Sequence, residues 1–339
     1  MKLLTLLDLD QGPGKALLDA TVAMGFSPEV ARAGLSAELR AWSEPGALDM
    51  VLEELPQGLD PARRPASVLV IGARTLPASM MRATLMARLL GARVCLKPAS
   101  GQAALGHALA LADPEVTVVE FTSDDVQALD GAIEQADAVV VLGSDETVSA
   151  VRARVSPEKA FVGYGHRLSV AWLARSDNAA LLGLARDLCA WDQAGCLSPQ
   201  VVWTTEPPAK VARRLAEAVR GVEVALPMTL TDDALAARQT ARTYGQMMGA
   251  VYETETALIC ALESPTFRSS PGHRVLWVLP ASIEALGEID AHLSTIGISG
   301  SLSAPLPGSV RRCALGEMQR PSLMWAHDGL PNLTPMLRV

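Results

Sequence analysis

The sequence predicts an α/β protein whose central part is a doubly wound parallel sheet. From residue 67 onward, short apolar runs alternate with helical segments, which is the pattern of successive strand–helix–strand units. The runs SVLVIGA and ADAVVVLGS are apolar throughout, as strands buried on both faces of a parallel sheet must be. Such sheets bind nucleotides at the carboxyl ends of their strands. The turns that follow the strands are therefore the first places to look for function.

Residues 1 to about 60 are predicted to be helical, with packing as their only role. In the clearest segment, SPEVARAGLSAELRAW, Ser27 can cap the helix and Pro28 suits its first position. Apolar residues recur at helical spacing here and predict one buried stripe: Val30, Ala33, Leu35, Leu39 and Trp42. A linker rich in Pro and Arg, LDPARRPAS, leads into the first strand.

Strands and helices are then expected in alternation. The strands are SVLVIGA, ARVCLKP, VTVVEF and ADAVVVLGS, and the helices between them are ARTLPASMMRATLMARLLGA, QAALGHALALA and DDVQALDGAIEQ. After the first strand, IGARTLPA has one glycine where the dinucleotide-binding fingerprint needs three. An ordinary Rossmann phosphate loop is therefore not predicted.

Polar residues follow three of these strands. They are Arg74, Thr75 and Pro77 after the first strand, Lys97, Pro98 and Ser100 after the second, and Gly143, Ser144, Asp145, Glu146 and Thr147 after the fourth. Each group taken alone is typical of a turn. Three groups at strand ends of one sheet favour a ligand site, because a lysine there can reach a ribose or a phosphate. Gly143 and Ser144 open a helix whose free N–H groups suit an anion.

Cys196 lies in a turn of small residues between an apolar helix and the strand VVWTT. Apolar residues predict the helix at helical spacing, namely Leu181, Leu184, Ala185 and Leu188. Asp177 or Asn178 can cap it, Gly195 is expected to end it, and Pro199 prevents its resumption. A thiol held between two rigid elements can face a cleft, where a nucleophile is useful. Most free cysteines are small buried hydrophobic residues, so packing is the alternative role.

The overall charge and hydropathy exclude several classes of protein. With 339 residues, of which 49% are hydrophobic, the chain has material for two domains with ample cores. A net charge of −8 and a pI near 5.2 argue against nucleic acid as the partner, since phosphate binding needs clustered cations. Apolar runs are too short to span a membrane, and acidic residues interrupt the N-terminus early, which makes it a poor secretion signal.

The five cysteines are an odd number scattered along the chain. Cys189 and Cys196 are the closest pair, and their spacing fits neither a zinc pair nor a redox pair. A reduced cytoplasmic protein is the simplest account. The histidines also lack metal-ligand spacing, so we expect no bound metal.

Five segments in a fixed order carry a resemblance to a known family. They are LKPAS, ADAVVVLGSDETVSAVRARV, FVGYGHRLSVAW, WDQAGCLSPQ and RPSLMWAHDGLPNL. This set resembles the fatty acyl-CoA reductases of bacterial bioluminescence operons, a branch of the aldehyde dehydrogenase superfamily. The resemblance runs from about residue 24 to the C-terminus. It implies an aldehyde-dehydrogenase-like fold, with a doubly wound nucleotide-binding domain and an α/β catalytic domain.

The resemblance also implies roles for individual residues. Cys196 matches the catalytic cysteine, and Lys97 matches the lysine that contacts the adenosine ribose. Gly143 and Ser144 match the pair beneath the pyrophosphate, and Glu146 in the same turn is counted with the cofactor-binding residues. Ser100 lies where NAD-preferring members carry a glutamate that binds the ribose 2′-hydroxyl. A carboxylate would repel a 2′-phosphate, whereas serine can donate to it, so the expected cofactor is NADPH.

Two positions depart from the family pattern. Thr75 stands where an asparagine usually helps to hold the oxyanion, and loss of one such donor costs roughly 10²–10³ in rate. Gly163 falls near the position of the glutamate that activates hydrolytic water in ordinary aldehyde dehydrogenases. A reductase benefits from that absence, because its acyl-enzyme must survive until hydride arrives. His327, within the run WAHDG, is a candidate proton donor to the thiohemiacetal oxygen, and a turn that fixes the C-terminus is its alternative role.

The expected domains are a helical segment (1–60), a nucleotide-binding domain (61–162), a catalytic domain (163–315) and a C-terminal segment that packs back on the first domain (316–339). The expected activity is NADPH-dependent reduction of an acyl thioester, as acyl-CoA or carrier-bound acyl, to an aldehyde. A weakened acyl-binding scaffold or acyl-transfer partner is the alternative, and oxidation of a free aldehyde to a thioester is a third. A homo-oligomer or a pathway-enzyme complex is expected. Four residues that could line an acyl channel are expected in the core instead: Met80, Met81, Trp191 and Trp203.

Overall fold

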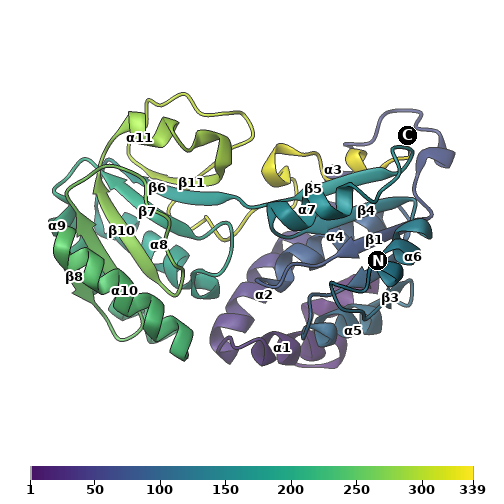
Figure 1. Cartoon of the computed structure of the whole chain (residues 1–339), viewed down its shortest axis with the longest axis horizontal. Helices are drawn as coiled ribbons and strands as arrows, with labels where there is room; N and C mark the ends of the chain where they lie inside the picture. Colours follow the sequence, from purple (N-terminus) through teal and green to yellow (C-terminus); the bar gives the residue numbers. More distant parts are fainter. Residues whose placement is uncertain (1, 339) are drawn as a thin grey trace. The chain divides into compact units, whose positions relative to one another are not determined.

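The computed structural model describes residues 2–338, and the chain forms two compact units (Figure 1). Unit 1 comprises Met1–Met24, Leu35–His166 and Ser322–Val339, and unit 2 comprises Gly25–Gly34 and Arg167–Pro321. The chain passes from unit 1 to unit 2 after His166 and returns to unit 1 at Ser322, and Gly25–Gly34, within the expected N-terminal segment, is assigned to unit 2.

Unit 1 contains a five-stranded parallel sheet of order β3-β2-β1-β4-β5. Its strands are β1 (Ser67–Ile71), β2 (Arg93–Lys97), β3 (Val116–Val118), β4 (Ala138–Leu142) and β5 (Ala160–Tyr164). Its crossover helices are α4 (Pro77–Leu89), α5 (Ala103–Ala112), α6 (Val126–Glu134) and α7 (Asp145–Arg152). The predicted doubly wound sheet is confirmed, because the chain order turns back at β1 and β4.

Burial follows each strand's place in this sheet. The inner strand β4, between β1 and β5, is buried at every residue, which explains its unbroken apolar sequence. Strand β3 lies at the edge and ends at Val118, so the predicted strand VTVVEF was too long. Val94 to Leu96 of β2 supply its only three register partners. Glu120 and Phe121 therefore leave the sheet and are available to line a cavity.

The N-terminal helices are η1 (Lys2–Leu7), α1 (Gly12–Ala23), α2 (Pro28–Ser43), α3 (Ala47–Leu52) and η2 (Pro61–Arg63). As predicted, Ser27 caps α2: its Oγ accepts a hydrogen bond from the Val30 amide at 3.2 Å. One residue of the predicted stripe was wrong, since Ala33 is exposed and Ala31 is buried instead. At 100° per residue, Ala33 falls on the side of the helix opposite the buried residues.

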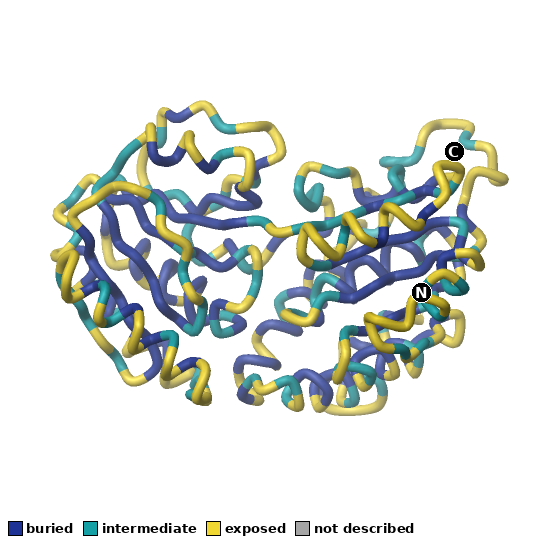
Figure 2. Tube along the Cα trace, viewed as in Figure 1, coloured by how far each residue is buried: buried dark blue, intermediate teal, exposed yellow. Residues whose placement is uncertain are grey.

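Unit 2 contains a seven-stranded sheet of order β12-β11-β6-β7-β10-β9-β8, in which β8 alone runs antiparallel. Its strands are β6 (Leu168–Leu173), β7 (Pro199–Thr204), β8 (Gly249–Glu253), β9 (Leu258–Leu262), β10 (Val275–Pro280), β11 (Leu293–Ser299) and β12 (Arg311–Ala314). Its helices are α8 (Asn178–Cys189), α9 (Pro208–Glu223), α10 (Asp232–Met248) and α11 (Ile283–Gly287). An apolar core lies on each face of the sheet, and Figure 2 shows the inner strands buried throughout.

The C-terminal segment is tied to other parts of unit 1. The Glu54 carboxylate accepts hydrogen bonds from the Asn332 amide and side chain, both at 2.7 Å, and from the Leu333 amide at 3.0 Å. The Arg338 amide donates to the Arg63 carbonyl at 2.8 Å. Two short helices lie in this segment, η5 (His327–Gly329) and η6 (Thr334–Met336). These contacts hold residues 332–338, which follow the WAHDG run.

Candidate active site

Cys196 lies in an exposed turn between α8 and β7. Helix α8 begins with Asp177 as its cap, whose carboxylate accepts from the Ala180 amide at 2.9 Å. It is followed by η3 (Ala190–Gln193), then by the turn, then by β7 at Pro199. The predicted helix–turn–strand arrangement around the thiol is confirmed, with Asp177 rather than Asn178 as the cap.

The end of α8 differs from the prediction. Gly195 does not end the helix, because α8 stops at Cys189 and the chain then turns left-handed. Trp191, Asp192 and Gln193 have φ values of 51°, 51° and 63°. For residues with a side chain, this conformation costs roughly 1–2 kcal/mol each. Three in succession persist only where the surroundings hold them in place.

Hydrogen bonds from Arg274 stabilise this left-handed turn. Its side chain is fully buried at 0% exposure. One terminal nitrogen, Nη2, donates to Asp192 Oδ1 at 2.5 Å, to the Leu226 carbonyl at 2.8 Å and to the Cys189 carbonyl at 3.1 Å. The other, Nη1, donates to Thr256 Oγ1 at 2.8 Å. The left-handed turn is thus fastened to a buried charge from a segment 82 residues away.

Trp191 anchors the same turn through packing. It is 3% exposed, and its ring meets Phe26 edge-on with a centroid distance of 5.3 Å. A Cβ at Gly34 would lie 2.2 Å from the indole, so only glycine fits there. The core role expected for four residues is confirmed by their burial: Met80, Met81, Trp191 and Trp203.

Gln193 closes the turn against the sheet. Its amide nitrogen donates to the carbonyls of Pro199 at 2.8 Å and Val275 at 2.7 Å. Gln193 is 5% exposed, so these bonds replace lost water contacts. They join the turn to the start of β7 and to β10.

The other four cysteines lie in environments that suppress thiolate formation. Burial raises the pKa of the Cys95 thiol, and it raises the pKa values of Cys189, Cys260 and Cys313 to about 11, 12 and 11. All five cysteines fall within residues 2–338, and Cys196 alone among them is exposed. Since the thiolate is the nucleophile, Cys196 is the cysteine best disposed to react.

The turn that follows β2, with the predicted cofactor residue Ser100, borders a cavity in unit 1. Lys97, the last residue of β2, is 8% exposed, and burial lowers the pKa of its ammonium. Its Nζ lies 5.5 Å from the centroid of the Phe121 ring. A cavity of ≈280 Å³ adjoins it, lined by Pro98, Ala99, Ser100, Gly101, Ala103, Glu120, Phe121 and Thr122. Its volume approaches the lower end of the range for small-molecule sites.

The predicted pyrophosphate residues stand at the start of α7. Ser144 is the cap of this helix, and its Oγ accepts from the Thr147 amide at 3.3 Å. A Cβ at Gly143 would lie 3.2 Å from Thr147 side-chain carbons, so the chain is tight there. Glu146 is exposed, and a hydrogen bond from Ser144 lowers the pKa of its carboxyl group. The helix N-terminus carries the positive end of the helix dipole.

Thr75 and His327 also belong to unit 1. Thr75 is exposed in the connection between β1 and α4. The His327 ring stacks on Tyr164 with centroids 4.1 Å apart and packs against Trp325 at 4.8 Å. Its side chain is 12% exposed. Burial raises the pKa of the Tyr164 hydroxyl to about 12, so this tyrosine stays neutral.

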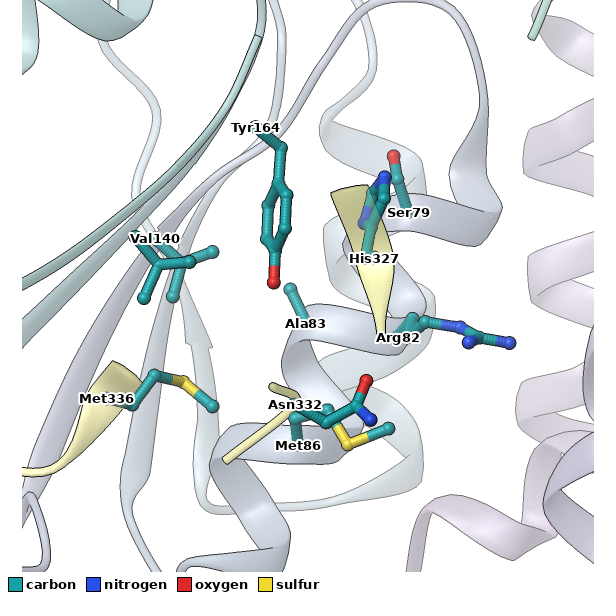
Figure 3. A pocket seen from close by; sticks show the side chains of 10 residues that line it. Ser79, Arg82, Ala83, Met86, Val140, Tyr164, His327, Asn332 and Met336 are labelled. Atoms are coloured by element: carbon teal, nitrogen blue, oxygen red, sulfur yellow. The ribbon is translucent and has the colours of Figure 1, made fainter. Parts of the chain in front are cut away.

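Figure 3 shows the small cavity beside this stack, with the Tyr164 and His327 rings side by side at one end. Its volume is ≈20 Å³, enough for a water molecule but not for a nucleotide. It is lined by Ser79, Arg82, Ala83, Met86, Val140, Val162, Tyr164, His327, Asn332 and Met336. The stacking agrees with the role of fixing the C-terminal segment, and proton donation by His327 stays a prediction.

Of the predicted site residues, Cys196 lies in unit 2 and the others lie in unit 1: Thr75, Lys97, Ser100, Gly143, Ser144, Glu146 and His327. Sequence reasoning missed Arg274, whose partners are distant in sequence and carry no local motif. Within residues 2–338, no cluster of three or more His, Cys, Asp or Glu has the geometry to hold a metal ion. In the same range, no helix combines the length and apolarity needed to cross a bilayer.

Comparisons with known proteins identify a family and a fold. A protein-family model described as acyl-CoA reductase (LuxC) matches residues 67–339. An aldehyde dehydrogenase from Brucella melitensis biovar abortus 2308 has a TM-score of 0.71 at 15% identity, over 93% of this chain and 75% of that one. Succinic semialdehyde dehydrogenase from Streptococcus pyogenes, solved with NADP⁺, has a TM-score of 0.66 at 12% identity, over 92% and 80%.

A third similar structure is NADP-dependent glyceraldehyde-3-phosphate dehydrogenase from Bacillus halodurans C-125, complexed with NADP. Its TM-score is 0.63 at 14% identity, over 99% of this chain and 85% of that one. No curated protein matches the chain. These likenesses confirm the predicted aldehyde-dehydrogenase-like fold.

Iodoacetamide at pH 7 is expected to alkylate Cys196 first, because burial raises the pKa of every other thiol. Peptide mass spectrometry after short labelling should find the adduct in the segment WDQAGCLSPQ. Cys196→Ser should lose the fast phase, and Cys313→Ser should keep it. Fast labelling of Cys95 or Cys313 in the folded protein would contradict this ranking.

Arg274→Met is expected to lower the free energy of unfolding by roughly 3–5 kcal/mol, since it leaves Asp192 and two carbonyls buried without their donor. Urea unfolding followed by tryptophan fluorescence measures the change. Arg242→Met is the matched control, because its ion pair with Glu253 is partly exposed and should contribute less than about 1 kcal/mol. Equal decreases in the free energy of unfolding of the two variants would contradict the expectation that Arg274 stabilises the protein more than a partly exposed ion pair does.

Proposed function

The chain belongs to the acyl-CoA reductase (LuxC) family, and on that premise we propose that it reduces an acyl thioester to an aldehyde with NADPH through the thiol of Cys196. Family and fold together make it an oxidoreductase that acts on aldehyde or acyl groups. The observation that carries the finer proposal is the exposure of Cys196 in a firmly anchored turn, while the other cysteines are buried or half-buried.

In the proposed first step, the Cys196 thiolate attacks the carbonyl carbon of acyl-CoA or of a carrier-bound acyl group. A bond forms between this carbon and Sγ, and the bond from the carbon to the donor's sulfur breaks. The donor leaves as a thiol after taking up a proton. The product is an acyl-enzyme in which Cys196 carries the acyl group as a thioester.

In the proposed second step, the acyl-enzyme is reduced. NADPH, when bound, supplies the hydride to the acyl carbon. The resulting thiohemiacetal collapses as its bond to Sγ breaks, which releases the aldehyde and restores the Cys196 thiolate. Thr75 is proposed to donate a hydrogen bond to the acyl oxygen. His327 is proposed to supply a proton to this oxygen as hydride arrives and to take it back as the bond to Sγ breaks. Gly163 near the end of β5 offers no carboxylate to activate water, which favours reduction over hydrolysis.

The proposed cofactor site combines two features of unit 1. The ≈280 Å³ cavity suits the adenosine end, with Lys97 beside it and Ser100 in its wall. The start of α7, with Gly143, Ser144 and Glu146, offers backbone N–H groups to the pyrophosphate. Ser100 can donate a hydrogen bond to a 2′-phosphate, which is the reason for proposing NADPH.

Incubation with a panel of acyl-CoA esters in the absence of cofactor is expected to leave an acyl group on Cys196. Intact-mass and peptide mass spectrometry measure the adduct, and NADPH should then release it as an aldehyde. Cys196→Ser should form no adduct, whereas Cys313→Ser should behave as wild type. An adduct that NADPH does not discharge would point to an acyl-binding scaffold, and no adduct with any ester would overturn the proposed mechanism.

Ser100→Glu is expected to weaken NADPH binding relative to NADH by roughly 10–100-fold, because the new carboxylate repels the 2′-phosphate. Fluorescence titration of both cofactors measures the ratio of their dissociation constants. Ser100→Ala, which removes the hydroxyl without adding charge, should shift the ratio less. An unchanged ratio in Ser100→Glu would place the 2′-phosphate away from this turn.

A further inference from the structure

Two partly buried hydrogen bonds tether the turn that carries Cys196. The hydroxyl of Ser169 donates to the carbonyl oxygen of Cys196 at 2.6 Å. The side-chain amide of Gln319 donates to Ser198 Oγ at 2.8 Å. Ser169 is 0% exposed and Ser198 is 1% exposed, so each tether has one buried partner that is largely shielded from water.

The first tether depends on an irregularity in the sheet. Ser169 in β6 pairs with Pro199 in β7, and the register shifts between Ser169 and Ala171. Such irregularities re-aim side chains and are common beside active sites. Here the Ser169 hydroxyl reaches the backbone of Cys196, just before β7 begins. The carbonyl of Cys196 is thus held toward the buried sheet, while the residue itself remains exposed.

The second tether comes from a loop that is itself fixed. The Asp187 carboxylate on α8 accepts from the amides of Gly316 at 2.5 Å and Met318 at 3.1 Å. The Arg311 guanidinium donates to the Met318 carbonyl at 2.8 Å. Gln319 therefore extends from a constrained backbone. Its partner Ser198 in turn donates its amide to the Gly195 carbonyl at 3.0 Å, across the Cys196 turn.

We propose that Ser169 and Gln319 are positioning residues that hold the Cys196 thiol in one outward orientation for attack. The proposal rests on the proposed role of Cys196 as the nucleophile. One neutral hydrogen bond contributes only about 1 kcal/mol to stability. A misplacement of about 1 Å at a reacting group can cost ~10²-fold in rate. Loss of a tether should therefore reduce the reactivity of the thiol more than it reduces the stability of the fold.

The variants Ser169→Ala and Gln319→Leu test this inference without any substrate. The second-order rate of Cys196 alkylation by iodoacetamide, measured by peptide mass spectrometry across pH 6–10, should fall at least threefold at pH 7. The midpoint of its pH profile should rise, because an untethered carbonyl can turn toward the thiol and destabilise its anion. Melting temperatures should fall by only a few degrees.

A rescue variant and a control variant distinguish a role in positioning the thiol from a general loss of stability of the fold. Gln319→Glu loses the amide donor, but its carboxylate can accept a hydrogen bond from the Ser198 hydroxyl, so the tether can re-form with its direction reversed. This variant should recover most of the rate that Gln319→Leu loses. Ser67→Ala removes a matched bond from a strand hydroxyl to a carbonyl, that of Gln135 at 3.0 Å in unit 1, and should leave alkylation unchanged. Gln319 is half-buried, so its variants remain informative if Ser169→Ala fails to fold.

Acylation by acyl-CoA supplies a second readout. The tether variants should lose at least tenfold in the maximal acylation rate while the half-saturating acyl-CoA concentration stays within twofold. Wild-type alkylation profiles in folded Ser169→Ala and Gln319→Leu would overturn the inference. If wild-type protein forms no acyl adduct, the proposed function fails, and the alkylation profiles still decide whether these residues position the thiol.

Discussion

The buried guanidinium of Arg274 is the constraint on which the candidate active site depends. A charge at 0% exposure is tolerated only when its hydrogen-bonding capacity is largely used, and Arg274 uses its two terminal nitrogens on four acceptors. Two of these acceptors belong to the chain around the left-handed turn: the Cys189 carbonyl lies before it, and the Asp192 carboxylate lies within it. Because Arg274 donates to both acceptors, it stabilises a backbone path that local preferences disfavour.

This path accounts for the exposed thiol. If α8 had continued as a regular helix to Gly195, Cys196 would lie at the end of that longer helix. The left-handed residues instead redirect the chain toward β7, and Gln193 fastens it there through the carbonyls of Pro199 and Val275. The strain of the turn is localised next to the proposed nucleophile, and rigid elements on both sides hold it. An exposed side chain in a fixed backbone is what a covalent mechanism requires.

Features that depend on neighbouring residues in the chain could be predicted from the sequence. The apolar runs predicted the parallel sheet of unit 1, and the caps at Ser27 and Asp177 were readable from residue type. The left-handed turn was not predictable, since Trp-Asp-Gln lacks the glycine or asparagine that usually signals it. Its cause is tertiary, because the anchoring Arg274 is 82 residues away. The length of β3 was missed for a similar reason, as its edge position rather than its composition ends it.

The proposed preference for NADPH depends on more of the fold than the turn after β2. With Ser100, the wall of the ≈280 Å³ cavity lacks the carboxylate that a glutamate at this position would supply. Glu120, however, places a carboxylate in the same wall. Its carboxylate lies 3.0 Å from the His107 imidazole, and both side chains are 60% exposed. A bound 2′-phosphate would therefore be attracted by the charge of Lys97 and repelled by that of Glu120. Because β3 ends early and releases Glu120 from the sheet, the edge of unit 1 contributes to the electrostatics of the proposed site as directly as the sequence motif does.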